Sequence, residues 1–218
     1  MAEPSEPGGG ASARPAVEAR LELADWRRQV SELYAAIRGH ADAVAAWELW
    51  KRERDRLYRT HPQSPIPLNE RGDATAPEYY PYDPALRVAA DVESGDGAAF
   101  ELPDSVSGHV IAERTGIARF TLAGERLSLS VFWLTDYAGG FFVSFRDATS
   151  GHETYGAGRY VLDTAKGADL GSGARGLILD FNFSYQPSCS YDPRWSCPLP
   201  PRENWLTVAI RAGERFRG

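Results

Sequence analysis

The chain has 218 residues, of which 43% are hydrophobic and 25% are charged, and its net charge is −6. This balance fits a globular protein with its own core, and the weakly acidic composition argues against a general nucleic-acid-binding protein. The first residues lack the basic start and apolar run of a secretory signal, and no apolar stretch is long enough to span a bilayer. We therefore expect a soluble, cytoplasmic protein with no nucleic-acid or membrane partner.

The N-terminal part of the chain is expected to form a tail followed by two helices. Residues 1–14 are rich in Gly, Pro, Ala and Ser, which predicts disorder. Apolar residues at three- and four-residue spacings predict a helical hairpin over residues 15–60, with Asp42 as the N-cap of its second helix. Prolines end that helix and begin an irregular segment, residues 61–85. Three tyrosines of this segment are expected to pack against the rest of the protein: Tyr79, Tyr80 and Tyr82.

Residues 86–218 are predicted to form an antiparallel β domain. Apolar and polar residues alternate with a period of two, which is typical of half-buried strands, and turn sequences separate the segments at residues 123–125, 138–140 and 171–173. No helix-length pattern lies between the strands, which argues against a parallel βαβ fold. We expect an α+β protein in which the hairpin packs on a β-barrel or sandwich of roughly eight or nine strands. A barrel is preferred because closure removes exposed strand edges.

The segment from Glu153 to Asn204 is the most chemically dense part of the sequence. Near its start, Gly156 and Gly158 lack the third glycine and the following helix of a phosphate-binding fingerprint. A turn at these glycines could present Arg159 to an anionic ligand, because a guanidinium suits carboxylate and phosphate groups. Alternatively, the glycines make a tight entry into a strand and Arg159 pairs with a nearby carboxylate.

A second candidate is the run from Leu179 to Tyr185. On a strand, Asp180 and Asn182 point to the same face. Together with Tyr185 they could line a polar pocket or hold a proton for acid–base catalysis. The alternative is that they face solvent or cap the following loop as Asx turns do.

The two cysteines, Cys189 and Cys197, lie in a proline-rich loop. Their spacing does not match a zinc ribbon and the four histidines are scattered, so we expect neither a metal site nor a cofactor. The thiols should be reduced by default in the cytosol. A structural or redox-active disulfide stays open, as does a role as small buried apolar groups.

The motifs of this sequence resemble a prokaryotic family catalogued as domain of unknown function 1684. The similarity runs from about Trp50 to Glu214, with small departures at Val161, Phe183, Ser184 and Gln186. It implies that the Glu153–Asn204 segment is characteristic of the family, without implying an activity. The matching residues are Trp50, Arg54–Asp55, His61–Pro65, Thr154–Tyr160, Leu179–Asn182, Cys189, Cys197–Pro201, Glu203–Asn204 and Ala212–Glu214.

The favoured function is the binding of a small anionic or polar ligand in a β-barrel, with the cysteine loop at the mouth of the pocket. One alternative is an enzyme, either hydrolytic through Asp180 or thiol-dependent through Cys189. Another is a structural or interaction module, because fold alone does not determine function. The oligomeric state stays open. The residues expected to contact the ligand are Tyr155, Arg159, Asp180, Asn182 and Tyr185.

Overall fold

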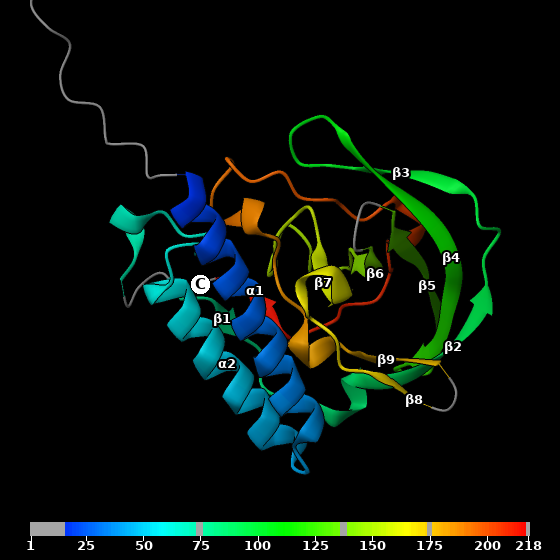
Figure 1. Ribbon diagram of the computed structural model, residues 1–218. Coiled ribbons are helices and arrows are strands. Elements are labelled where there is room, and N and C mark those ends of the chain that lie inside the picture. Colours follow the sequence, from blue (N-terminus) through cyan, green and yellow to red (C-terminus); the bar gives the residue numbers. More distant parts are fainter. Residues whose placement is uncertain (1–15, 73–75, 136–138, 174–175, 217–218) are drawn as a thin grey trace, which may run out of the picture.

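The computed structural model describes residues 16–72, 76–135, 139–173 and 176–216. The tail predicted for residues 1–14 lies outside them. Two α-helices come first along the described chain and an antiparallel sheet follows, which confirms the α+β class (Figure 1). Neither of these helices is both long and apolar enough to cross a membrane.

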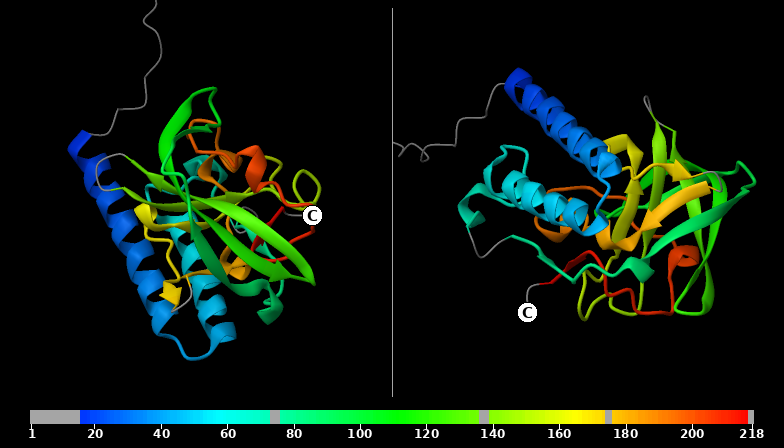
Figure 2. Two further views of the ribbon diagram at one scale, coloured as in Figure 1. Left: turned by 90° about the vertical axis from the view of Figure 1, so that its right-hand side faces the viewer. Right: turned by 90° about the horizontal axis from the view of Figure 1, so that it is seen from below.

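The two helices, α1 (Ala16–Gly39) and α2 (Ala43–Thr60), form an antiparallel hairpin on one side of the sheet (Figures 1 and 2). The Asp42 side chain accepts hydrogen bonds from the amides of Val44 and Ala45. These bonds satisfy backbone donors that a helix leaves unpaired in its first turn, so α2 can begin only a few residues after α1 ends. The N-cap predicted at Asp42 is confirmed.

The irregular segment between α2 and the sheet packs aromatic rings against the hairpin, as expected. The ring of Tyr79 lies 5.4 Å from that of Trp50, and the ring of Tyr82 lies 6.2 Å from that of Trp47. The described residues of the segment include two 3-10 helices and a short strand: η1 (Leu68–Glu70), β1 (Glu78–Tyr79) and η3 (Pro84–Leu86). Strand β1 pairs with β10 (Glu214–Arg215).

The main sheet has the strand order β7-β6-β5-β4-β2-β9-β8, and β3 pairs with β4. Every pair of strands in it is antiparallel. Residues 172–173, which the sequence predicts to be part of a turn, instead form strand β8. The strands are β2 (Arg87–Ser94), β3 (Ala99–Pro103), β4 (His109–Leu122), β5 (Glu125–Leu134), β6 (Gly140–Phe145), β7 (Arg159–Asp163), β8 (Ser172–Gly173) and β9 (Gly176–Asp180).

The sheet is strongly curved (Figures 1 and 2). Register shifts between Arg114 and Gly116 and between Val143 and Ser144 contribute to the curvature, since bulges increase the local twist. Among the described residues, the hydrogen-bonded path ends at β7 on one side and at β8 on the other, so it stays open. The predicted choice of a barrel over a sandwich is therefore not confirmed.

Both faces of the curved sheet are covered by apolar packing. On one face, Phe132 and Phe142 join a core with the hairpin residues Tyr34 and Trp50. On the concave face, residues of β2, β4, β5, β6, β7 and β9 surround a second core. One end of this concave core is filled by 3-10 helix η5 (Phe181–Phe183) and by apolar side chains of residues 206–212. The segment 206–212 therefore acts as a plug at that end of the sheet.

Candidate functional site

Arg159 begins strand β7 and is fully buried. Gly158 before it has a φ of +104°, and a Cβ there would lie 2.5 Å from the carbonyl oxygen of Phe145, so only glycine fits this close approach. The guanidinium donates hydrogen bonds to the carbonyl oxygens of Ile210 (2.8 Å) and Glu214 (3.1 Å), and also to that of Ala212. The turn thus aims Arg159 at the C-terminal segment of the chain.

Arg159 also lies 3.4 Å from a carboxylate oxygen of Asp147, which is buried too. Burial lowers the pKa of the guanidinium, while the Asp147 carboxylate opposes this shift. The Asp147 carboxylate accepts a 2.7 Å hydrogen bond from the amide of Ile210, so both members of the pair bind the same segment. Arg159 therefore holds residues 210–214 in place, and both of its terminal nitrogens already have protein partners.

Asp180 and Asn182 do not share a strand, because β9 ends at Asp180 and residues 181–183 form η5. The Asp180 carboxylate accepts hydrogen bonds from the amide (3.1 Å) and side chain (2.8 Å) of Asn182, which is the Asx-type cap left open by the sequence. Its second oxygen lies 3.1 Å from a guanidinium nitrogen of Arg87. Burial raises the pKa of Asp180.

The Asn182 side chain is fully buried and bonds the backbone of Asp83 in both directions. Its oxygen accepts from the Asp83 amide and its nitrogen donates to the Asp83 carbonyl, each at 2.8 Å. This pairing fixes the irregular segment to the end of β9. Asp180 and Asn182 thus belong to one hydrogen-bonded network, and the bonds of Arg159 go to other residues of the described chain.

Tyr185 is buried under the hairpin. Its ring lies 4.5 Å from the guanidinium carbon of Arg54 on α2, and its hydroxyl donates to Asp163 at 3.4 Å. Burial raises the pKa of Tyr185. Tyr185 also lines a cavity of about 50 Å³ between the hairpin and the sheet, which is room for little more than ordered water. Arg159, Asp180 and Tyr185 were predicted to contact one ligand. Each instead contacts a different set of residues.

The remaining candidates do come together. The hydroxyl of Tyr155 lies 3.8 Å from the sulfur of Cys189, and the amide of Cys189 donates to the sulfur of Cys197 at 3.3 Å. Both cysteines are free thiols. The hydrogen bond from the Cys197 thiol lowers the pKa of Cys189 to about 6, whereas the same bond raises the pKa of Cys197. Among the described residues, no group of three or more His, Cys, Asp or Glu side chains could hold a metal ion.

An apolar cavity of about 420 Å³ lies at the end of the concave face opposite the plug. The side chains of Trp133 and Phe141 are each 37% exposed there, and their rings meet edge to face at 5.0 Å. Val92 and Leu177 form the facing wall. The sequence reasoning missed this cavity. The signal for it was the pair Phe141–Phe142, since adjacent aromatic residues on a strand indicate that both faces of the sheet have apolar surroundings.

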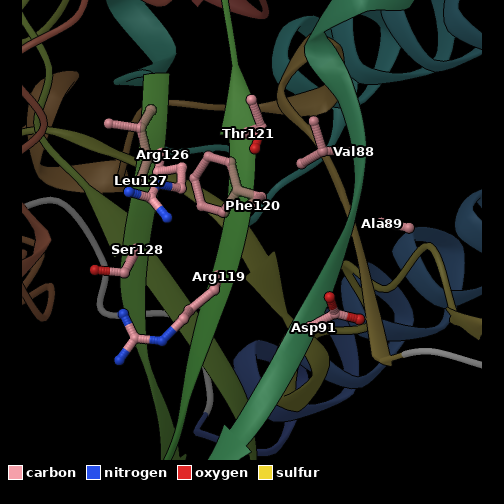
Figure 3. Close-up of a pocket in the computed structure, with 9 residues that line it drawn as sticks. All are labelled: Val88, Ala89, Asp91, Arg119, Phe120, Thr121, Arg126, Leu127 and Ser128. Carbon is pink, nitrogen blue, oxygen red and sulfur yellow. The ribbon is translucent and has the colours of Figure 1, made fainter. Parts of the chain in front are cut away.

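A larger cleft of about 770 Å³ opens where β2 and β4 diverge (Figure 3). The two strands pair only over Asp91–Ser94 of β2, whereas the preceding residues of β2, 87–90, pair with β9 alone. Phe120 and Leu127 lie deep in this opening, and Arg119 and Arg126 lie along its outer side (Figure 3). Arg119 is already paired with Glu93 at 2.7 Å.

Comparison with known proteins agrees with the motif resemblance. The family described as "Protein of unknown function (DUF1684)" matches residues 75–215. A solution NMR structure of an uncharacterized protein from Haloarcula marismortui is 38% identical, and the similarity covers 76% of this chain and 90% of that one, with a TM-score of 0.57. No curated protein matches. The chain belongs to the DUF1684 family.

Proposed function

We propose that this protein binds a small, uncharged, largely apolar molecule in the cavity at the open end of its curved sheet. The observation that carries the proposal is the lining of that cavity. Trp133 and Phe141 expose aromatic surface to it, although residues of the same sheet face such as Leu129 and Val131 are buried in the core. A volume of about 420 Å³ falls in the range of small-molecule sites, which are concave and mostly apolar.

Strand register supports one shared concave surface. Val131 pairs with Gly116 and Trp133 pairs with Phe141, so side chains two residues apart on β5 point into the same space. Val131 is 1% exposed and forms the floor, whereas Trp133, one step further along, reaches the rim. The apolar interior thus continues outward into the cavity.

The facing wall comes from the other half of the sheet. Val92 of β2 pairs with Ala118, and Leu177 of β9 pairs with Ala90; both alanines are fully buried in the concave core. Gly116 leaves room for this wall, because a Cβ there would lie 2.7 Å from a methyl carbon of Val92. A flat apolar molecule between the two walls would remove rings and branched side chains from water, at about 25 cal/mol per Å² of apolar surface.

The polar ligand expected from the sequence is not part of this proposal. The carboxylate, amide and guanidinium of Asp180, Asn182 and Arg159 are bonded to other parts of the chain. Recruiting them for a ligand would leave buried partners unpaired, at a cost of about 1–3 kcal/mol for each group. These residues support the structural alternative that the sequence left open.

Titration with the neutral fluorescent probe N-phenyl-1-naphthylamine tests the proposal. The wild-type protein should show saturable binding, and Trp133→Ala should weaken it at least about tenfold, which corresponds to 1.4 kcal/mol. Trp205→Ala is the matched control, because Trp205 is 39% exposed but packs between Arg146 and Arg202. The proposal fails if the wild type shows no saturable binding, or if both variants bind as tightly as the wild type.

A further inference from the structure

Two thiols outside the apolar cavity are arranged as an outer and an inner group. Cys197 is only 2% exposed, whereas Cys189 is partly exposed. The amide of Cys189 donates to the sulfur of Cys197 at 3.3 Å, so the backbone at one cysteine touches the side chain of the other. Of the two cysteines, Cys189 is therefore the more accessible to a reagent from solvent.

Hydrogen bonds hold Cys197 against the end of β3. The amide of Ser105 donates to the carbonyl of Cys197 at 3.0 Å, and the amide of Cys197 donates to the hydroxyl of Ser105 at 3.1 Å. The amide of Leu199 donates to the carbonyl of Pro103 at 2.7 Å. The backbone of Cys197 is therefore fixed from both sides by hydrogen bonds.

Cys189 is held separately in 3-10 helix η6 (Ser188–Ser190), which follows Pro187. The amide of Ser190 donates to the carbonyl of Pro187 at 2.9 Å and closes this turn. The hydroxyl of Tyr155 approaches the Cys189 sulfur at 3.8 Å from another part of the chain. Donors around a sulfur favour its thiolate form, which is the nucleophile in thiol chemistry.

The acidities of the two thiols agree with this geometry. Hydrogen bonds from Cys197, Ser105 and Tyr155 lower the pKa of Cys189 to about 6, while Cys197 keeps its proton. The ionised outer thiol is suited to attack a disulfide. The protonated inner thiol can then resolve the mixed disulfide that forms.

We propose that Cys189 and Cys197 form a redox-active dithiol that exchanges with small-molecule disulfides. The Cys189 thiolate attacks one sulfur of a disulfide RSSR, forming a mixed disulfide and releasing RS⁻, which takes up a proton. Cys197 then loses its proton and attacks the Cys189 sulfur, so that the second RS⁻ leaves and is protonated in turn. The protein dithiol is oxidised by two electrons, and RSSR is reduced to two RSH.

The position of the pair favours exchange over a permanent cross-link. Only residues 190–196 lie between the two cysteines. Closing so short a loop restricts the unfolded chain less than closing a long one, so the disulfide adds less to stability. Because Cys189 is partly exposed, a reducing thiol can also reach the oxidised form from solvent.

Equilibration in mixtures of reduced and oxidised glutathione tests the inference on the full chain. After acid quenching and alkylation with N-ethylmaleimide, the intact mass and a peptide map report free thiols, glutathione adducts and the Cys189–Cys197 disulfide. Oxidising mixtures should convert the wild type to a monomer with the internal disulfide and no adduct. An adduct that persists without the internal disulfide, or thiols that stay alkylatable throughout, would overturn the proposal.

Two serine variants assign the roles. Cys197→Ser should trap glutathione on Cys189, whereas Cys189→Ser should react with oxidised glutathione at least about tenfold more slowly because its remaining thiol is buried. Equal rates in the two variants would contradict the assignment. Circular dichroism checks the fold of each variant. If Cys197→Ser unfolds, the wild-type peptide map still shows whether the Cys189–Cys197 disulfide forms, since that measurement requires no substitution at the buried position.

Discussion

Arg54 of α2 and Glu214 of β10 form an ion pair across 160 positions of sequence. The Glu214 side chain is fully buried, and that of Arg54 is 11% exposed. The second carboxylate oxygen of Glu214 accepts hydrogen bonds from the amide of Gln186 (2.6 Å) and the hydroxyl of Tyr191 (3.2 Å). The helical hairpin, the cysteine loop and the C-terminal strand therefore meet at one carboxylate.

Replacing Arg54 by Met should lower the free energy of unfolding by about 3–5 kcal/mol, because it leaves Glu214 as an unpaired buried charge. Urea denaturation measures this loss. Arg56→Met is the matched control on the same helix, since Arg56 is 48% exposed and its pair with Glu53 should contribute little. Equal losses in the two variants would show that the Arg54–Glu214 pair has no special role.

Arg159→Met should lower the free energy of unfolding by a similar amount, about 3–5 kcal/mol. The carbonyls of residues 210–214 lose their donor and Asp147 loses its partner. Arg159→Lys should restore only part of the loss, since an ammonium cannot copy the planar fork of a guanidinium. Hydrogen exchange should show the amide of Ile210 losing protection. A loss below about 1 kcal/mol would contradict the structural role of Arg159.

Asn182→Ala should lower the free energy of unfolding by about 1–3 kcal/mol, because it removes two hydrogen bonds between the buried Asn182 side chain and the backbone of Asp83, each contributing about 0.5–1.5 kcal/mol. Thermal unfolding and hydrogen exchange at Asp83 measure the effect, and the affinity for N-phenyl-1-naphthylamine should stay unchanged. The exposed Asn69 offers a control, and Asn69→Ala should leave stability nearly unaltered. If Asn182→Ala changed probe affinity without changing stability, Asn182 would be a binding residue after all.

Asp163→Asn should stabilise the protein increasingly as pH rises. Burial raises the pKa of Asp163 in the folded state, so its favourable contribution is complete below the ordinary pKa and is lost as pH rises through the raised value. The side chain of asparagine does not ionise, so the variant keeps its stability as pH rises. Its carbonyl oxygen can still accept the hydrogen bond from the backbone amide of Lys166. Urea denaturation at several pH values measures the free energy of unfolding of the variant and of the wild type. The variant's excess stability should increase from acid to neutral pH.

Asp104→Asn provides a control of opposite sign. The amides of Gly108 and Val106 lower the pKa of Asp104, so its contribution is present above the ordinary pKa and is lost as pH falls. This variant should therefore be less stable than the wild type at neutral pH, and the difference should shrink in acid. If both differences moved with pH in the same direction, the assignment for Asp163 would be wrong.

Local patterns predicted those parts of the fold that depend on neighbouring residues. The helical spacing and the cap at Asp42 were confirmed, and so were the antiparallel strands. The alternating pattern failed at the end of β9, because Phe181 and Phe183 continue the period of two although Asp180 already caps a 3-10 turn. A side-chain cap can end a strand without any change in hydropathy.

The candidate site was harder to predict, because its residues find partners far away in sequence. Nothing near Arg159 indicates that its acceptors lie more than 50 positions later. The cysteine loop was recognised from composition, and the contact between Cys189 and Cys197 stayed open because it depends on how β3 holds the loop. The apolar cavity needs the curvature of the whole sheet, which no single strand specifies.

The plug and the strand that follows it also constrain the order of assembly. Arg54 and Arg159 emerge from the ribosome well before residues 210–214, which supply the acceptors for both. Until that segment arrives, burying Arg54 would desolvate its charge without the Glu214 carboxylate, and burying Arg159 would leave its guanidinium with Asp147 but without its three carbonyl acceptors, so both burials would be unfavourable. The hairpin can form its helices early, but its docking must wait for the last part of the fold to be made. A chain stalled before Ile210 should therefore be a better substrate for chaperones and proteases than its hydrophobic content suggests.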